Sequence, residues 1–351
     1  MNKRDGNDKK NSKGKPMTWS RRAARWTVLS TVAAFAILCG VGAWYARHPL
    51  EWLEKNERTL PSFAVRPLMY FGDRTLMLSD ALGWTGHDAV YDFDEPAPEG
   101  NVFYAGMPVR KGAPAPADIK VLERGPFAIG WSDSLQHPAW VAYHVPVDEK
   151  FEAGKRPSFR KDRSVAKSPA ASAYDRTGYD RGHLAPNRAI ATRFGPEAQS
   201  QTFLMSNIAP QSPALNRGPW RELEQRIADL WTKRWGEIWV ICGSISGSND
   251  RSRQTLPGTR IDVPESYWML ITAQTADGVR ALALILPQTV GYGDFPVHRI
   301  VTINELEKAT GFDLLPDLPS YLKAPLKADR PTRLWPVRLR DILKLILVRF
   351  V

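Results

Sequence analysis

Cysteine is scarce in this sequence, which limits how the fold can be stabilised. There are two in 351 residues, Cys39 in a long apolar run and Cys242 in a segment typical of a core strand. We do not expect them to form a disulfide, so a disulfide framework is excluded and a buried core has to supply the stability. Hydrophobic residues make up 43% of the chain, enough for such a core. Two cysteines do not identify the redox compartment. Internal repeats are absent as well.

An excess of positive charge is missing from the middle of the chain. The formal net charge is +11, but residues 1–26 contribute +7 and residues 322–351 contribute +6, which leaves −2 for the rest. The overall charge is therefore weak evidence for nucleic-acid binding. Residues 155–193 differ, with a local net charge of +7. This stretch is suited to the phosphates of a polyanion, although a solvated basic surface would have the same composition.

One long run without charge occurs at residues 27–46, and it has the length of a membrane helix. Trp26, Trp44 and Tyr45 lie at its ends, where such rings favour the membrane interface. The basic residues 1–26 should stay cytoplasmic, so we predict a transmembrane signal anchor. The rest of the chain would then lie in the periplasm or another non-cytosolic space. The alternative is export after signal-peptide cleavage, for which 41–43 (Val-Gly-Ala) is a small-residue site.

The remaining chain divides into three parts by composition. Residues 47–99, with an acidic, proline-containing end, are predicted to be a stalk or an N-terminal extension. Residues 100–320 are the predicted folded domain, and residues 321–351 are a basic amphipathic tail. Residues 336–351 are too short and too charged to span a membrane. They are suited either to an anionic membrane surface or to a terminal helix docked on the domain.

Hydrophobic patterning inside the domain predicts a mixed α+β fold. A strand pair is expected at 127–131 and 139–145, joined by a polar turn, and further strands at 238–242, 267–271 and 281–286. The third of these strands is expected to end at Gly243. A helix is predicted from Pro219 to about Arg234, since proline suits the first helical position. A shorter helix at 302–308 should stop near Gly311.

Two segments carry candidate catalytic groups: 179–186 (YDRGHLAP) and 215–224 (LNRGPWRELE). The imidazole of His183 can accept a proton from water near neutral pH. The side-chain oxygen of Asn216 is a hard, neutral ligand suited to Mg²⁺. Glu224 lies eight residues further on, roughly 80° round a helix that begins early enough. Each piece alone is more typical of a turn, a cap or a solvated surface, but the combination predicts a metal-assisted phosphodiesterase.

In these motifs the sequence resembles the DNA/RNA non-specific endonuclease family. The resemblance covers about residues 100–320 and implies a ββα-metal fold, in which two short strands and a helix hold one Mg²⁺ on a larger antiparallel sheet. Further matching segments are 140–143 (WVAY), 156–162 (RPSFRKD), 205–211 (MSNIAPQ), 263–268 (VPESYW) and 309–313 (ATGFD).

The resemblance also implies roles for single residues. His183 would be the general base and Asn216 the one direct protein ligand of the metal, with water at most other positions. Glu224 would orient the metal's water from the second shell. Arg156 would stabilise charge on the phosphate in the transition state, with Arg160 as a nearby alternative.

Three more residues are expected at the site: Arg181 among the catalytic residues, and Asp180 and Asn207 in its supporting shell. Asp180 and Arg181 would position the histidine or touch phosphate, and Asn207 would belong to the supporting shell. Nothing in this scheme reads a base, so DNA and RNA are both expected substrates. The family also implies 5′-phosphate and 3′-hydroxyl products. Mn²⁺ in place of Mg²⁺ and a homodimer are both compatible with the sequence.

Two other functions remain open from the sequence. One is a catalytically inactive nucleic-acid-binding module of the same fold, tethered at a membrane. The intact trio of His183, Asn216 and Glu224 argues against it, because a decayed site would be expected to lose a member. The other is a phosphodiesterase for small or lipid-linked substrates, suggested by the amphipathic tail.

Overall fold

The computed structural model describes residues 90–93, 95–247, 253–291, 294 and 296–337, with six further residues between 30 and 44. The predicted cytoplasmic tail at 1–26, most of the predicted anchor at 27–46 and most of the 47–99 segment lie outside the described residues. Residues 338–351 also lie outside them. Within the described part, no helix combines the length and apolar character needed to cross a membrane. The membrane anchor therefore stays a prediction.

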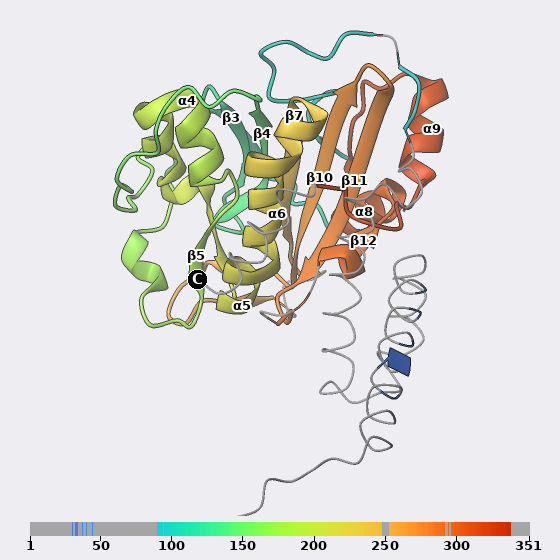
Figure 1. The fold of residues 1–351 in the computed structure, drawn as a ribbon. Coiled ribbons are helices and arrows are strands. Elements are labelled where there is room, and N and C mark those ends of the chain that lie inside the picture. Colours follow the sequence, from blue (N-terminus) through green and yellow to red (C-terminus); the bar gives the residue numbers. More distant parts are fainter. Residues whose placement is uncertain are drawn as a thin grey trace, which may run out of the picture.

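A seven-stranded antiparallel sheet forms the centre of the structure (Figure 1). Nearly every residue of the central strand β7 (Ile238–Ile245) is buried, as is every residue of its neighbour β4 (His137–Val145). Strands covered on both faces read as continuous apolar runs, which is why the sequence predicts them. In sheet order the strands are β12 (Ile300–Val301), β11 (Gly278–Pro287), β10 (Ser266–Thr275), β7 (Ile238–Ile245), β4 (His137–Val145), β3 (Phe127–Ser132) and β2 (Ile119–Glu123).

The predicted α+β class with a central antiparallel sheet is confirmed, and the predicted strands are present, mostly longer than expected. The expected end of β7 at Gly243 was wrong, because the strand continues to Ile245. Gly243 instead allows close packing within the sheet. A Cβ at this position would lie 2.1 Å from the carbonyl oxygen of Ala139 and 2.9 Å from the ring of Trp268. Glycine in a strand marks close approach here and not a turn.

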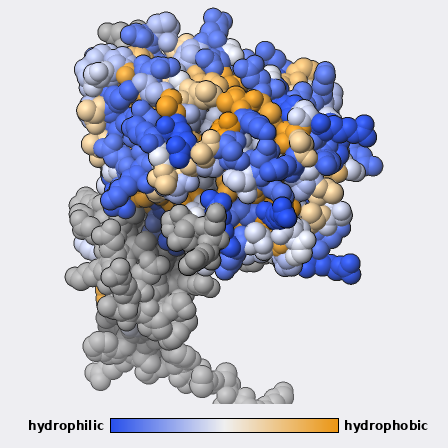
Figure 2. Space-filling view, turned by 180° about the vertical axis from the view of Figure 1, so that it is seen from behind, coloured by the Kyte–Doolittle hydropathy of each residue, from blue (hydrophilic) through white to orange (hydrophobic). Residues whose placement is uncertain are grey.

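The two faces of the sheet are covered by different helices (Figure 1). Side chains alternate along β4, so Val141 and Tyr143 enter one core cluster while Trp140 and Ala142 enter another. The first cluster is shared with α4 (Asn187–Thr202) and the helical segment 213–235. The second is shared with α8 (Ile303–Thr310) and α9 (Ser320–Ala328). Figure 2, the opposite view, shows apolar side chains gathered near the middle of a largely hydrophilic face.

Two short strands and a helix lie beside the large sheet and carry the predicted motifs. β5 (Asp180–His183) pairs antiparallel with β6 (Ile208–Gln211). The helical segment that follows begins at Pro213, six residues before the predicted start, with the Ser212 hydroxyl as its cap. It runs in consecutive pieces: α5 (Pro213–Leu215), η3 (Asn216–Trp220), α6 (Arg221–Gln225), η4 (Arg226–Trp231) and α7 (Thr232–Trp235).

The short predicted helix near residue 302 is confirmed as α8. Thr302 caps it in a capping box with Glu305, in which each side chain accepts a hydrogen bond from the other residue's backbone N–H. Gly311 ends the helix in the left-handed conformation, with φ of 74°. Both ends are therefore fixed by local chemistry.

Residues that precede and follow the predicted domain in the sequence also pack against it. Tyr91 pairs with Val279 of β11, so the end of the 47–99 segment contacts the sheet. Trp335 is buried, and its ring centroid lies 5.3 Å from that of Trp231. The packed part thus extends to Val337, past the expected start of a tail at residue 321, because Trp335 and Val337 bury their apolar side chains.

The remaining elements are short. The strand pairs are β1 (Val109–Arg110) with β13 (Phe312–Asp313) and β8 (Gln254–Thr255) with β9 (Asp262–Val263). The single-turn helices are η1 (Ala171–Tyr174), η2 (Met205–Asn207) and η5 (Pro296–Arg299).

Candidate active site

The carboxylate of Asp180 joins β5 to the start of the site helix, by which we mean residues 213–235. Asn216 Nδ2 donates to Asp180 Oδ2 over 2.9 Å, and Arg217 donates to both carboxylate oxygens over 2.8 and 2.6 Å. Burial acts to raise the pKa of Asp180, but the hydrogen bonds from Arg217 and Asn216 outweigh it and hold the pKa below its usual range. Asp180 is therefore charged at neutral pH.

This contact fixes which way the Asn216 amide faces. A carboxylate only accepts hydrogen bonds, so the amide nitrogen has to face Asp180 and the oxygen has to face away. The side chain is half-buried, which leaves one hard oxygen held in a defined direction at the edge of β5. Asp180 thus acts as the positioning residue for Asn216.

His183 ends β5 between two phenylalanine rings. Its ring centroid lies 5.2 Å from that of Phe159 and 4.8 Å from that of Phe203. The residue is half-buried, yet its Nε2 atom is buried and has no hydrogen-bond partner in the described part of the chain. An unpaired buried ring nitrogen is costly, so this atom is a candidate acceptor for a water or substrate proton.

The environment of His183 lowers its basicity. Burial and the nearby Arg156 guanidinium lower the pKa of His183 from 6.5 to about 3. This differs from the near-neutral value expected from the sequence. In the substrate-free protein the imidazole is therefore neutral throughout the physiological range, which is the state that a proton acceptor needs.

Glu224 has the opposite shift. Burial raises the pKa of Glu224 from 4.5 to about 8, against the opposing effects of a hydrogen bond from Trp220 and the charges of Arg156 and Arg221. The Trp220 indole Nε1–H donates to Glu224 Oε1 over 3.1 Å. Trp220 and Glu224 are four residues apart, so they lie on one side of the site helix.

Two sets of contacts connect the site helix with the segment that contains β5. At one end Asn216 contacts Asp180. At the other, burial raises the pKa of the Cys242 thiol, and Glu224 lies close enough for its charge to add to this rise. The Cys242 thiol in turn donates to the carbonyl oxygen of Leu184, over 3.4 Å, directly after His183. Figure 1 shows α5 beside β5 at the lower edge of the molecule.

The candidate arginines differ in what they contact. Arg156 is exposed and close enough to influence both His183 and Glu224. The alternative, Arg160, donates to the Ser200 hydroxyl over 2.9 Å and is bound to α4. The geometry therefore favours Arg156.

The guanidinium of Arg181 is bonded to groups of the protein itself, unlike that of an arginine that is free to bind phosphate. Its Nε and one terminal nitrogen donate to the carbonyl oxygen of Ala171 over 2.9 and 2.6 Å, and the guanidinium also pairs with Asp175. It lies 5.7 Å from the Phe159 ring centroid, which flanks His183. These contacts suit a residue that positions the histidine.

Asn207 is fully buried and fixes the chain after His183. Its Oδ1 accepts from the backbone N–H of Ala185 over 2.8 Å, and its Nδ2 donates to the carbonyl oxygens of Ala185 and Thr202, both over 3.0 Å. All its side-chain hydrogen bonds thus go to backbone. Its role as a supporting residue of the site stays a prediction.

The residues at the site fit one weakly held Mg²⁺. The directed oxygen of Asn216 is a hard ligand, and Mg²⁺ commonly keeps several waters and few protein ligands. No group of three or more His, Cys, Asp or Glu side chains able to hold a metal ion occurs in the described ranges. The expected site, with one amide as its direct protein ligand, does not need such a group.

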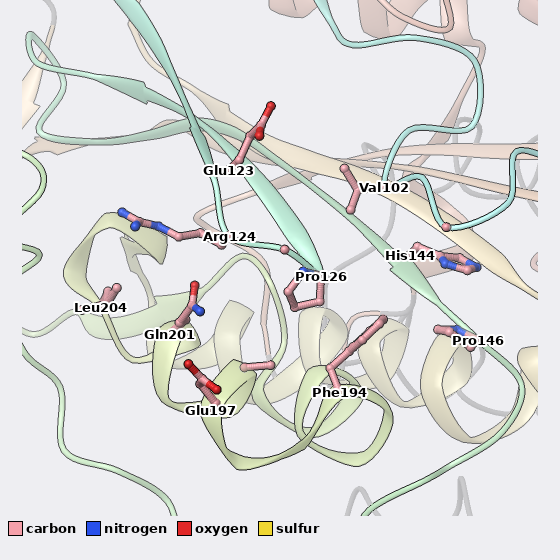
Figure 3. A pocket seen from close by; sticks show the side chains of 13 residues that line it. Val102, Glu123, Arg124, Pro126, His144, Pro146, Phe194, Glu197, Gln201 and Leu204 are labelled. Carbon is pink, nitrogen blue, oxygen red and sulfur yellow. The ribbon is translucent and has the colours of Figure 1, made fainter.

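A large cavity elsewhere contains none of the candidate residues. Its volume is about 890 Å³, and it is open between α4 and the ends of β3 and β4. Figure 3 shows Glu197 and Gln201 on the α4 side, across from Glu123 and Arg124. The guanidinium of Arg124 forms an ion pair with Asp162. The cavity is separate from the seam between β5 and the site helix, where the candidate chemistry lies.

Sequence reasoning missed several groups around the site. Trp220 was detectable, because it lies one turn before Glu224 on the same helix side. Arg217 adjoins Asn216, but nothing in the sequence pairs it with Asp180. The contact of Phe203 with His183 arises from tertiary packing and has no local signal.

We expect Glu224→Gln to change how stability depends on pH in the metal-free protein. The folded-state pKa of about 8 lies above the usual 4.5, so the stabilisation from a protonated Glu224 is full below pH 4.5 and is lost as the pH rises through 8. The neutral amide should not show this loss. From pH 5 to pH 9 the wild type should lose about 4 kcal/mol more than the variant, or roughly 8–16 °C in Tm.

Thermal unfolding followed by circular dichroism measures this difference. Glu197→Gln is the matched control, because Glu197 is exposed. Parallel pH curves for the wild type and Glu224→Gln would show that the carboxyl is not protonated in the folded protein at neutral pH.

Comparison with known proteins agrees with this geometry. The model of the DNA/RNA non-specific endonuclease family matches residues 107–320. The nuclease of Serratia marcescens is 29% identical over 216 residues, which are 58% of this chain and 78% of that protein. The mitochondrial nuclease EXOG of Mus musculus is 28% identical over 207 residues, 54% of this chain, so the chain spans about half (55%) of that relative.

A solved structure shares the fold. The crystal structure of the EndoG/EndoGI complex contains a chain that superposes with a TM-score of 0.55 and 21% identity, covering 65% of this chain and 95% of that one. The family match spans more than half of the chain, including every candidate residue named above. The chain therefore belongs to the DNA/RNA non-specific endonuclease family and is a metal-dependent endonuclease.

Proposed function

We propose that this endonuclease hydrolyses phosphodiester bonds of both DNA and RNA without sequence preference, with Mg²⁺ as its metal. His183 is the general base and Asn216 the metal ligand. The observation that supports this most is the pairing of the two motifs. Asp180 holds the Asn216 amide at one end of β5, and the neutral, unpaired Nε2 of His183 lies at the other end of the same strand.

His183 performs the proton transfer from water in this scheme. Its imidazole is neutral before substrate binds and can take a proton at Nε2. Burial and, after it, the guanidinium charge of Arg156 lower the pKa of His183, and an anionic phosphate beside Arg156 would offset the second of these effects. Substrate binding therefore makes the imidazole more basic when a base is required.

Arg156, Asn216 and Glu224 act on the phosphate and its surroundings. Arg156 is exposed next to both ionisable groups and can stabilise the negative charge that builds up on the phosphate. Asn216 would hold the ion, and Glu224 would accept hydrogen bonds from water beside it. Mg²⁺, when bound, supplies Lewis-acid stabilisation of charge on the leaving 3′ oxygen.

The substrate range follows from the kind of groups present. The candidate residues carry charge, one imidazole and amides directed to backbone or to Asp180, none of them arranged to read a base edge. The basic stretch 155–193, with its net charge of +7, contacts the sugar-phosphate backbone, which carries no sequence information. We expect 5′-phosphate and 3′-hydroxyl products.

A nuclease assay tests this function directly. Purified protein is incubated with supercoiled plasmid and with a structured RNA, in Mg²⁺ and in excess chelator. Both polymers should be degraded in Mg²⁺ and both should survive in chelator, with activity restored by added Mg²⁺ or Mn²⁺. Binding without cleavage would instead indicate an inactive nucleic-acid-binding module, and cleavage of dinucleotides alone would indicate a small-substrate phosphodiesterase.

We also propose that residues 27–46 anchor the protein in a membrane, with the nuclease domain on the non-cytosolic side. The twenty uncharged residues and the basic residues before them support this proposal. A reporter that works only in exported compartments should be active when fused after Val351. A fusion active only with a cytoplasmic reporter would contradict this orientation, and a soluble, shortened product would indicate signal-peptide cleavage.

A further inference from the structure

The hydroxyl of Tyr143 is buried beneath the site and has no hydrogen-bond partner in the described part of the chain. Tyr143 lies near the end of β4 and is 0% exposed. A buried hydroxyl without a partner destabilises the folded state, so in solution it is expected to bond to a protein group or an ordered water. A phenylalanine would fill the same space without this requirement.

The sheet directs Tyr143 towards the site helix. Val141 and Tyr143 share one face of β4, and Cys242 of β7 lies opposite Val141 on that face. All three belong to the first core cluster, together with Leu223, the residue before Glu224. Tyr143 therefore approaches the site helix from below, on the sheet side.

Glu224 meets different groups on its two sides. Burial raises the pKa of Glu224, and the charges of Arg156 and Arg221, which are at least partly exposed, oppose this rise. On the sheet side are the Cys242 thiol and the Tyr143 hydroxyl. Burial raises the pKa of each, and the nearby charge of Glu224 adds to both rises. The thiol already donates to Leu184. Of these two groups, the hydroxyl is the one with a hydrogen still to donate.

We propose that the Tyr143 hydroxyl donates to one buried water that in turn donates to the Glu224 carboxylate, and thereby positions it. Tyr143 would be a positioning residue for the endonuclease. Only the catalytic consequence rests on the proposed function; the contact itself does not. A donated O–H favours the charged carboxylate and opposes the effect of burial. Glu224 would then be held on both sides, by Trp220 and by Tyr143.

The contact can be measured in the metal-free protein without any assay of activity. Glutamate labelled with ¹³C at the side-chain carboxyl is titrated by NMR, and Glu224→Gln identifies the Glu224 signal. Tyr143→Phe removes the donor, so the pKa of Glu224 should rise by about one unit above the wild type. Tyr104→Phe is the control, since Tyr104 bonds to Gln274 in the second core cluster and should leave the titration unchanged.

An unchanged or lowered pKa of Glu224 in Tyr143→Phe would overturn the proposal. Thermal unfolding gives an independent check. Loss of a hydrogen bond lowers the Tm of Tyr143→Phe, whereas removal of an unpaired buried hydroxyl raises it. A higher Tm would therefore also count against the contact.

Kinetics then test the catalytic consequence. Tyr143→Phe should reduce kcat about tenfold and shift the pH–rate profile, and neither effect should appear when Glu224→Gln is already present. Equal effects in both backgrounds would mean that Tyr143 acts elsewhere. If the wild type cleaves no nucleic acid, the proposed function fails, while the NMR titration still decides whether the two side chains are connected.

Discussion

Replacement of His183 by alanine should reduce kcat for plasmid cleavage by about a thousandfold, within the range that a positioned general base contributes. The imidazole is held between Phe159 and Phe203 and supplies an unpaired Nε2, and alanine removes the proton acceptor while leaving Asp180 and Asn216 in place. Substrate binding, measured by fluorescence anisotropy in chelator, should be nearly unchanged. The loss should therefore appear in kcat and not in affinity.

Two controls make this result specific. His144→Gln alters a histidine that pairs with Glu237 over 3.1 Å and stacks on Trp239, away from the site, and activity should stay within a few fold of wild type. Added imidazole should partly restore His183→Ala, because the space between the two phenylalanine rings can admit it. Cleavage by His183→Ala within tenfold of wild type would remove His183 as the base.

Asn216→Ala should abolish most of the metal-dependent activity, with a loss of about 100-fold or more. Lewis-acid stabilisation contributes several kcal/mol to the transition state, and each 1.4 kcal/mol is a factor of ten. Alanine removes the directed oxygen, and Asp180 keeps its ion pair with Arg217, so β5 should remain in place. Binding of Mn²⁺ to the protein, followed by electron paramagnetic resonance, should weaken in parallel.

The matched control is Asn304→Ala, an exposed asparagine on α8 far along the chain from the site. It should bind Mn²⁺ and cleave as the wild type does. Asn216→Asp keeps an oxygen but places a second carboxylate against Asp180, so it should also lose activity through repulsion. Undiminished Mn²⁺ binding by Asn216→Ala would assign the metal to other ligands.

The sequence predicted the parts of the site that depend on local chemistry. Consecutive apolar residues predicted β4 and β7, and motif spacing brought His183, Asn216 and Glu224 forward as candidates. The start of the site helix was misplaced because the η3 piece contains Gly218 and Pro219, which resemble a helix boundary. The chain passes through them with one non-helical residue, Gly218, at φ −105° and ψ −115°.

What escaped prediction depends on contacts between distant segments. The pKa of His183 cannot be read from its neighbours in sequence, because burial by tertiary packing and the charge of Arg156 set it. The hydrogen bonds of Asp180 with Asn216 and Arg217 connect it to residues that lie 36 and 37 positions further along the chain. The pKa of His183 and the hydrogen bonds of Asp180 depend on the tertiary packing around β5.

The far end of the site helix has a consequence for the newly made protein. Trp231 and Arg234 donate hydrogen bonds to the backbone carbonyls of Trp335 and Val337, over 2.8 and 3.0 Å. The amino end of a chain leaves the ribosome first, so the helix that carries Asn216 and Glu224 can form these two hydrogen bonds only after residue 337 has emerged. Until then the indole N–H of Trp231, which is buried in the folded protein, lacks this acceptor, so the far end of the site helix is completed late in synthesis.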